Sequence, residues 1–174
     1  MNIKELCKIA VFAAIIAVCA QISIPMPFGV PMTLQTLAIA LAGVMLGTKN
    51  GTIAVFVYIL LGAVGLPVFA NLSGGMGVIF GPTGGFILAF PLFAFATAMG
   101  AKRGRLGFMG WLVLGKVVLY SSGFLMFSLV TGNSLLASVG FVALPFLPLA
   151  LVEVAFIGIL GKNMRQVVAK SGVL

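Results

Sequence analysis

The chain has 174 residues, of which 62% are hydrophobic and 7% are charged, with ten Lys and Arg, two acidic residues and no histidine. A soluble domain carries about 25% charged residues, so this chain has too few polar side chains to cover a water-exposed surface. The absence of histidine excludes a Ser-His-Asp triad and histidine-ligated metal sites. We therefore expect an all-α integral membrane protein with no metal site and no histidine-based catalytic site.

Six apolar runs, separated by Gly, Pro and charged residues, are long enough to cross a bilayer as helices. They cover about 8–25, 33–48, 51–69, 84–100, 107–131 and 144–161. No soluble domain, long linker or internal repeat interrupts them. The sequence therefore predicts a six-transmembrane-helix bundle that forms a single membrane domain over residues 1–174.

The first run carries alanines at helical spacing, among them Ala10, Ala14 and Ala17. Small residues on one face of a helix allow another helix to approach closely in a bilayer. This face is expected to pack a neighbouring helix, either within the bundle or in a separate membrane partner.

The basic residues alternate from one interval between runs to the next. Nine of the ten fall in intervals that lie on one side of the membrane in this topology, and the opposite intervals (25–32, 70–83 and 132–143) have no charge. The nine are Lys4, Lys8, Lys49, Lys102, Arg103, Arg105, Lys162, Arg165 and Lys170. By the positive-inside rule both termini are expected to be cytoplasmic, and the positive charge is explained without nucleic-acid binding.

Two segments on the uncharged side, residues 25–36 and 65–86, are rich in Pro and Gly. Pro interrupts helices, and irregular backbone at membrane depth is tolerated only where protein buries it or where it lines a cavity. Both segments are expected to be irregular lids over an outward-facing ligand pocket. Gly84 and Gly85 begin the fourth run, where free backbone N–H groups of a helix N-terminus can face an anion.

Two charges lie inside the apolar runs. Lys116 is ten residues into the fifth run, roughly 15 Å deep at 1.5 Å per residue, and Glu153 reaches a similar depth in the sixth. Tyr120 is one helical turn from Lys116 and shares its face. An ionisable group at this depth indicates a functional site unless it is paired, so the two charges either fix the helix register or line a polar cavity.

Three long motifs of the chain are specific enough to indicate a family. They read Val30-Pro-Met-Thr-Leu-Gln-Thr-Leu-Ala-Ile-Ala-Leu-Ala-Gly-Val-Met-Leu-Gly47, Tyr58-Ile-Leu-Leu-Gly-Ala-Val-Gly-Leu-Pro-Val-Phe69 and Gly81-Pro-Thr-Gly-Gly-Phe86. In order and spacing they resemble the BioY family, the biotin-specific substrate-binding (S) components of energy-coupling factor (ECF) vitamin transporters. The resemblance covers nearly the whole chain.

The resemblance implies a six-helix bundle in the plasma membrane of a bacterium, with an outer vitamin pocket capped by loops and no catalysis of its own. It also implies that the Ala10, Ala14 and Ala17 face docks on a membrane coupling subunit driven by two cytosolic ATPase subunits. Asn71 matches a position where the family places a polar contact to the bicyclic ring. The residues expected to bind substrate are Asn71, Gly84, Gly85, Phe86, Lys116, Tyr120 and Glu153.

The sixth run departs from the family pattern. Where the family has Pro-Phe-Leu-Pro-Gly-Asp-x-x-Lys, this chain places Ala150 at the aspartate and Glu153 at the lysine. The family aspartate is expected to accept from the ureido N–H groups and the lysine to pair with the valerate carboxylate, so neither role transfers. The ligand is expected to be biotin, with lipoate as the alternative, because a dithiolane has no N–H to donate to an aspartate.

Two other classes of function stay open. An intramembrane enzyme would need a nucleophile and a base, for which Lys116 is a candidate, and a pore-forming bundle would need no Gly/Pro lids. Turnover without ATPase subunits would favour the first, and ligand-independent conductance would favour the second. The oligomeric state is not encoded in any of these patterns.

Overall fold

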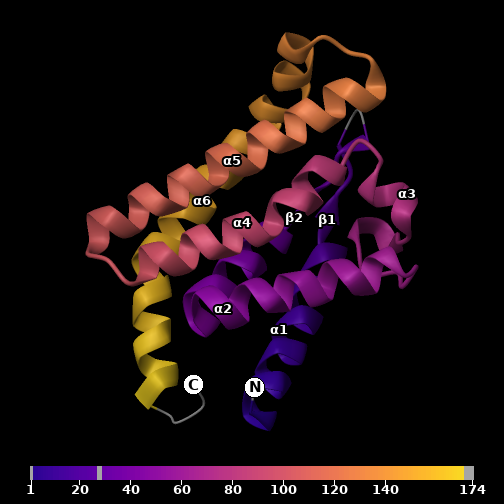
Figure 1. The fold of residues 1–174 in the computed structure, drawn as a ribbon. Helices are drawn as coiled ribbons and strands as arrows, with labels where there is room; N and C mark the ends of the chain where they lie inside the picture. The colour runs from indigo at the N-terminus through magenta and orange to yellow at the C-terminus, as the bar shows by residue number, and fades with distance from the viewer. Residues whose placement is uncertain (1, 27–28, 171–174) are drawn as a thin grey trace.

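The computed structural model describes residues 2–26 and 29–170, and nearly all of its regular structure is helical. The elements in chain order are α1 (Ile3–Gln21), β1 (Ser23–Ile24), β2 (Met32–Thr33), α2 (Gln35–Ala63), η2 (Ala70–Leu72), α3 (Met76–Ile79), α4 (Gly84–Ala101), α5 (Arg105–Thr131) and α6 (Leu135–Lys170). The long helices run between two ends of the molecule. The two chain ends lie at one of these, and β1, β2, η2 and α3 gather at the other (Figure 1).

α1 begins where Asn2 and Glu5 close a polar turn, since the Asn2 backbone N–H donates to Glu5 Oε2 at 3.0 Å. This hydrogen bond holds the pKa of the Glu5 carboxyl below its usual range. Beyond α1, β1 and β2 pair as a short antiparallel ribbon with Ser23 opposite Thr33. The segment predicted to be irregular, residues 25–36, thus contains the second strand of this ribbon and the first residues of α2.

α2 covers both the second and the third predicted runs. Gly47 interrupts it with φ 78° and ψ −176°, a conformation essentially restricted to glycine, so α2 consists of two helical stretches joined by a kink. The third run was predicted to continue to residue 69, and this is wrong. The helix ends at Ala63, because the left-handed Gly65 (φ 100°) and Pro67 follow it.

α4 is the central helix and packs against α2 on one side and α5 on the other. Most of its residues are buried, and small residues permit the close approach. A Cβ on Gly43 of α2 would collide with the Ala94 carbonyl of α4, and one on Gly115 of α5 would lie 2.8 Å from the Phe93 ring. Pro91 lies inside α4, where it is buried among these neighbours.

The connection between α5 and α6 is shorter than predicted. α5 ends at the left-handed Gly132, and Ser134 caps the next helix by accepting from the Ala137 backbone N–H at 3.2 Å. α6 therefore starts at Leu135 rather than near residue 144. Most of the uncharged interval 132–143 therefore belongs to α6 and is not a loop.

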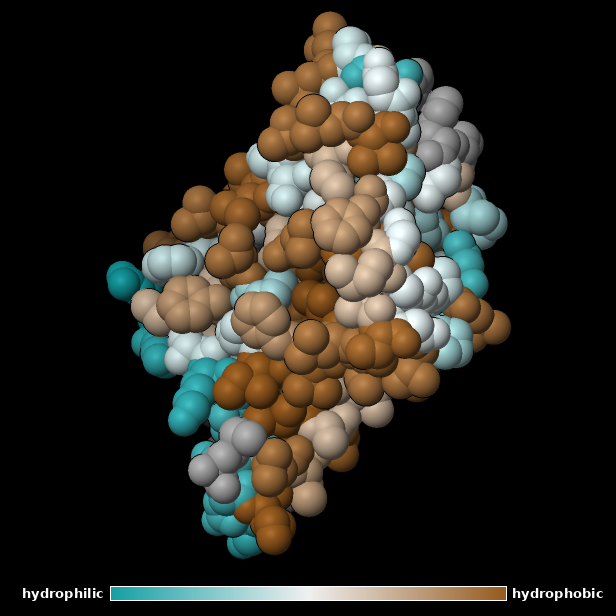
Figure 2. Space-filling model, turned by 45° about the vertical axis from the view of Figure 1, so that its right-hand side comes forward, coloured by the Kyte–Doolittle hydropathy of each residue, from teal (hydrophilic) through white to brown (hydrophobic). Residues whose placement is uncertain are grey.

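Three helices of the described residues are long and apolar enough to cross a membrane: α2, α4 and α5. α6 contributes a shorter apolar stretch, Phe146–Ile159. Figure 2 shows broad apolar surface with hydrophilic side chains clustered at the lower left. Large apolar side chains such as Leu88, Leu92 and Leu151 are more than half exposed, which is the surface expected of a protein that faces lipid.

Replacing Gly47 with Ala should lower the free energy of unfolding of the detergent-solubilised protein by about 1–3 kcal/mol, because an L side chain is strained at this φ and ψ. The melting temperature should fall accordingly. No heavy atom would lie within 4 Å of the new Cβ, so the loss would come from the backbone alone. Gly110→Ala is the matched control, since Gly110 also has open space but lies in regular helix. Equal melting temperatures for the two variants would contradict a strained kink.

Candidate functional site

A cavity of about 200 Å³ lies at the end of the fold where the β ribbon and the lid segment (residues 64–83, between α2 and α4) come together. Its walls come from β2, the first turn of α2, the lid segment, and facing parts of α4, α5 and α6. The lining residues are Gly29, Val30, Pro31, Thr33, Gln35, Thr36, Phe69, Ala70, Asn71, Ser73, Val78, Thr83, Phe86, Ile87, Phe90, Tyr120, Phe146 and Leu149.

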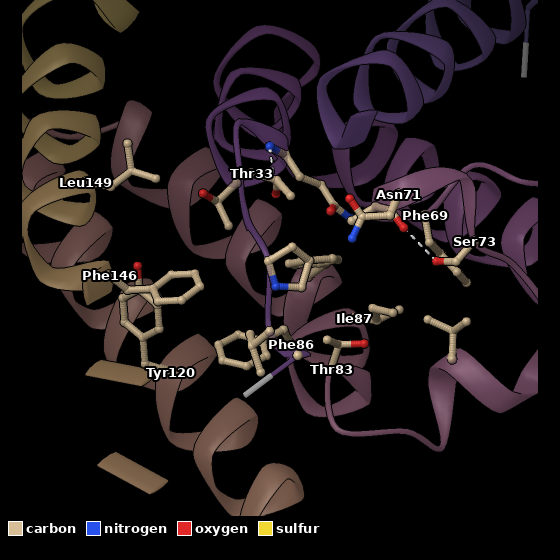
Figure 3. Close-up of a pocket in the computed structure, with 18 residues that line it drawn as sticks. Thr33, Phe69, Asn71, Ser73, Thr83, Phe86, Ile87, Tyr120, Phe146 and Leu149 are labelled. Atoms are coloured by element: carbon tan, nitrogen blue, oxygen red, sulfur yellow. Dashed lines mark hydrogen bonds between the residues drawn. The ribbon is translucent and has the colours of Figure 1, made fainter. Parts of the chain in front are cut away.

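One wall of the cavity is aromatic. Phe86 of α4 stacks on Phe146 of α6 with ring centroids 6.3 Å apart, and Tyr120 of α5 meets both rings edge-on at 6.2 and 6.3 Å. In Figure 3 these three rings lie together on one side of the space, and Asn71 and Ser73 lie on the other. Such a wall is suited to bury the apolar body of a ring-shaped ligand.

Other parts of the lining, together called the polar wall, present hydroxyl and amide groups. The polar lining residues are Thr33, Gln35, Thr36, Asn71, Ser73 and Thr83. Gln35 is buried at the start of α2, and its Nε2 donates to Tyr58 Oη at 2.7 Å. Of the described residues that line the cavity, none is charged. The site therefore offers neutral hydrogen-bonding groups to a ligand.

A buried ion pair lies directly behind this wall. Lys116 of α5 is 5% exposed, Glu153 of α6 is 2% exposed, and Lys116 Nζ pairs with Glu153 Oε2. Thr36 of α2 donates its hydroxyl to the same carboxylate, 2.7 Å from Oε1 and 2.9 Å from Oε2. The ammonium also faces the Phe93 and Tyr120 rings, at 5.1 and 5.6 Å from their centroids.

This arrangement satisfies both charges inside the bundle. Removing an ion from water costs several kcal/mol, and only close pairing with further hydrogen bonds offsets that cost. The ammonium has a carboxylate and two aromatic faces, and the carboxylate has an ammonium and a hydroxyl. The pair thereby connects α5 and α6, and through Thr36 it connects both to the first turn of α2.

The lid segment is tied to the end of α1 by Gln21. The Gln21 Nε2 donates to the Phe69 carbonyl at 3.0 Å and to the Val68 carbonyl at 3.3 Å, and the Leu72 backbone N–H donates to Gln21 Oε1 at 2.9 Å. Ser23 adds a hydrogen bond to Asn71 Oδ1 at 2.7 Å. Asn71 and Leu72 have positive φ values of 58° and 54°, so this turn is strained and depends on the tethers.

The sequence-predicted substrate residues fall into three groups. Asn71, Phe86 and Tyr120 line the cavity. Lys116 and Glu153 meet in an ion pair that does not line the cavity. Glu153 contacts the lining residue Thr36, and the Lys116 ammonium faces the ring of the lining residue Tyr120. The role of Lys116 as partner of a ligand carboxylate stays a prediction, and in this geometry its ammonium is occupied by Glu153.

Gly84 and Gly85 form the third group and are absent from the described cavity lining. A Cβ on Gly84 would collide with the Ile79 carbonyl, and one on Gly85 with the Ser122 carbonyl. Ser122 Oγ also donates to the Gly85 carbonyl at 2.8 Å. These two glycines therefore allow α3 and α5 to pack closely on the start of α4, a packing role that the sequence pattern alone does not distinguish from anion binding.

Sequence reasoning missed most of the polar wall. Gln35 and Thr36 belong to the proline-rich segment, residues 25–36, which was predicted only to be a lid. Phe146 belongs to the sixth apolar run and was not predicted to bind substrate. A usable signal was present, because adjacent polar residues directly before a long apolar run need partners or a ligand. Ala150 is 7% exposed and does not appear in the described lining.

The alanine face of α1 lies outside the cavity. Ala10 and Ala14 are exposed and Ala17 is half-buried, and Ala17 packs against the core. The exposed part of this face lies beside apolar residues such as Val11, Ile15 and Val18. The surface is apolar, nearly flat and available to another helix. Among the described residues, no group of His, Cys, Asp or Glu is placed to hold a metal ion.

Removing Lys116 or Glu153 alone should destabilise the protein by about 3–5 kcal/mol, because each single change leaves one charge buried without its partner. The Lys116→Met, Glu153→Gln double variant should lose less than the sum of the two single losses. Thermal unfolding of the three variants in detergent measures this coupling. Strictly additive losses would mean that the two side chains do not interact in the folded protein.

The chain is similar to known proteins along almost its whole length. The family model for the BioY family matches residues 1–170. A probable biotin transporter BioY of Pyrococcus horikoshii is 38% identical over 165 residues, covering 95% of this chain and 98% of the relative. The biotin transporter BioY of Thermotoga maritima is 38% identical over 167 residues, covering 94% and 96%.

A solved structure shares the fold. The crystal structure of the S-component for biotin from an ECF-type ABC transporter matches with a TM-score of 0.83 and 26% identity, covering 94% of this chain and 92% of that one. The relatives are named as transporters and not as enzymes, which removes the intramembrane-enzyme alternative. The family resemblance seen in the sequence is thus confirmed, and the chain belongs to the BioY family of membrane transport proteins.

Proposed function

We propose that this chain is the S component of an ECF-type vitamin uptake transporter and that it binds biotin in the cavity described above. The observation that carries the proposal is the pairing of an aromatic wall with a neutral polar wall in one cavity. Biotin has an apolar bicyclic body and chain, and a ureido group that both donates and accepts hydrogen bonds. Its two surfaces correspond to the two walls.

In this proposal Asn71, Phe86 and Tyr120 contact the ligand directly. Lys116 and Glu153 influence the ligand indirectly, through their contacts with Tyr120 and Thr36. Gly84 and Gly85 allow the close packing at the start of α4. The lid segment covers the ligand, and its strained turn at Asn71 is the part that has to open.

We further propose that residues 1–174 form one membrane domain with six spans, the two halves of α2 counted separately. The clustered Lys and Arg residues support an orientation in which both termini face the cytoplasm and the cavity faces outward. The location would be the plasma membrane of a bacterium. The face of α1 that carries Ala10, Ala14 and the half-buried Ala17 would dock on a membrane coupling subunit that works with two cytosolic ATPase subunits.

Purified protein should bind biotin more tightly than lipoate, and cells that contain the whole transporter should take biotin up. Ala14→Trp should abolish uptake while the purified variant still binds biotin, because the indole would block close helix approach without reaching the cavity. Isothermal titration and radiolabelled uptake measure the two properties. Val117→Trp, on an exposed position of α5, is the matched control and should keep both.

Failure of the purified protein to bind biotin would overturn the ligand assignment, and preferential lipoate binding would replace it. If Ala14→Trp lost binding and uptake together, the alanine face would belong to the substrate site rather than to a docking surface.

Gln21→Met should loosen the lid segment without disturbing the cavity floor. The substitution keeps the length of the side chain and removes its three hydrogen bonds to the lid backbone, which together contribute about 1–3 kcal/mol. Residues 66–73 should then exchange amide hydrogens faster in the ligand-free protein. Ser23→Ala removes only an exposed tether and should have the smaller effect. Unchanged exchange in Gln21→Met would mean that the lid is held by other contacts.

A further inference from the structure

Thr36 lies at the point where the buried ion pair meets the cavity. It is half-buried in the first turn of α2, lines the cavity, and contacts both oxygens of Glu153. In the described part of the chain Glu153 also accepts from Lys116, which does not line the cavity. The Thr36 hydroxyl is therefore the direct hydrogen-bonded link between Glu153 and the cavity.

The chemistry of Glu153 decides the direction of the hydrogen bond. Glu153 accepts from the Lys116 ammonium in the ion pair, and a carboxylate in that role has no hydrogen to donate. A threonine hydroxyl has one hydrogen and two lone pairs. Because both short contacts of Thr36 Oγ1 go to this carboxylate, its single hydrogen is committed to Glu153.

We infer that Thr36 is a fixed hydrogen-bond acceptor toward the ligand, held in that role by Glu153, and that the cavity selects a ligand with an N–H donor at this position. This inference rests on the proposed function and adds to it the residue that distinguishes between ligands. Glu153 is a positioning residue here, because it acts through Thr36 and does not line the cavity.

The inference separates the two candidate ligands. The ureido group of biotin presents two N–H donors, so one of them can reach Thr36. The dithiolane of lipoate presents none, and a ligand carboxylate would bring an acceptor against an acceptor. Leaving a buried polar group of the site without its partner is the effect that gives strong discrimination between similar ligands.

Glu153 is buried and its carboxylate lies outside the described cavity lining. This carboxylate reaches the cavity by way of the Thr36 hydroxyl. The site thereby keeps an acceptor for a ligand N–H while its charge remains paired with Lys116.

The test compares ligands and variants in one set of titrations on the purified protein. The ligands are biotin, biotin methylated on its ureido nitrogens, and lipoate, and the proteins are the unaltered chain, Thr36→Val and Thr36→Ser. Thr36→Val should weaken biotin binding roughly tenfold and bind methylated biotin no worse than the unaltered protein does. Thr36→Ser, which keeps the hydroxyl, should restore most of the affinity.

Thr52→Val is the matched control. Thr52 lies on the same helix, and among the described residues its buried hydroxyl oxygen has no hydrogen-bond partner and it does not line the cavity. The biotin affinity of Thr52→Val should therefore be unchanged. The unaltered protein provides a test that needs no variant, because it should bind methylated biotin roughly tenfold more weakly than biotin.

Three results would overturn the inference. Equal losses for biotin and methylated biotin in Thr36→Val would mean that the hydroxyl does not meet a ureido N–H, although biotin transport would stand. Lipoate binding as tight as biotin binding by the unaltered protein would mean that no donor is selected. Absence of any biotin binding by the unaltered protein would overturn the proposed function itself, and the inference with it.

Discussion

The buried pair of Lys116 and Glu153 is the interaction on which the rest of the site depends. A charge inside an apolar bundle has no water to solvate it. Each of these two side chains is therefore stable only in contact with the other. The pair therefore fixes α5 against α6, and the Thr36 hydroxyl brings the start of α2 to the same point. Every wall of the cavity except the lid segment belongs to one of these helices or packs directly on them. The position of one ion pair thus sets the geometry of the pocket.

The lid depends on a different kind of interaction. Its turn at Asn71 and Leu72 adopts left-handed backbone angles that cost energy for residues other than glycine, and the amide of Gln21 compensates by satisfying three backbone groups. Gln21 is the last residue of α1, the helix whose other face carries the exposed alanines. A displacement of α1 by a partner would therefore reach the lid through side-chain amide bonds. A rigid floor and a tethered lid are what a protein needs in order to hold a ligand and later release it.

Much of the fold could be predicted from the sequence, because hydropathy and charge report directly on the membrane. The apolar runs, the Gly/Pro-rich segments between them and the meeting of Lys116 with Glu153 follow from composition and a rise of 1.5 Å per residue. The length of α6 and the early end of α2 did not follow, since Ser134 and Gly65 act through local capping and φ angles. Gly84 and Gly85 resemble an anion site in sequence and are packing contacts in space. Only the three-dimensional contact with Glu153 identifies Thr36 as part of the site.

The location of the charge also matters for a protein that must be stable both empty and loaded. A charged side chain in the cavity wall is satisfied by water or ligand, so its energy changes each time the ligand enters or leaves. In this chain the ammonium and the carboxylate satisfy each other behind the wall, and only the neutral Thr36 hydroxyl faces the cavity. Emptying the site then exposes hydroxyl lone pairs, which water can solvate at little cost. The empty state need not rearrange to protect a buried charge, and the binding energy can come from the aromatic wall and from hydrogen bonds that the ligand alone completes.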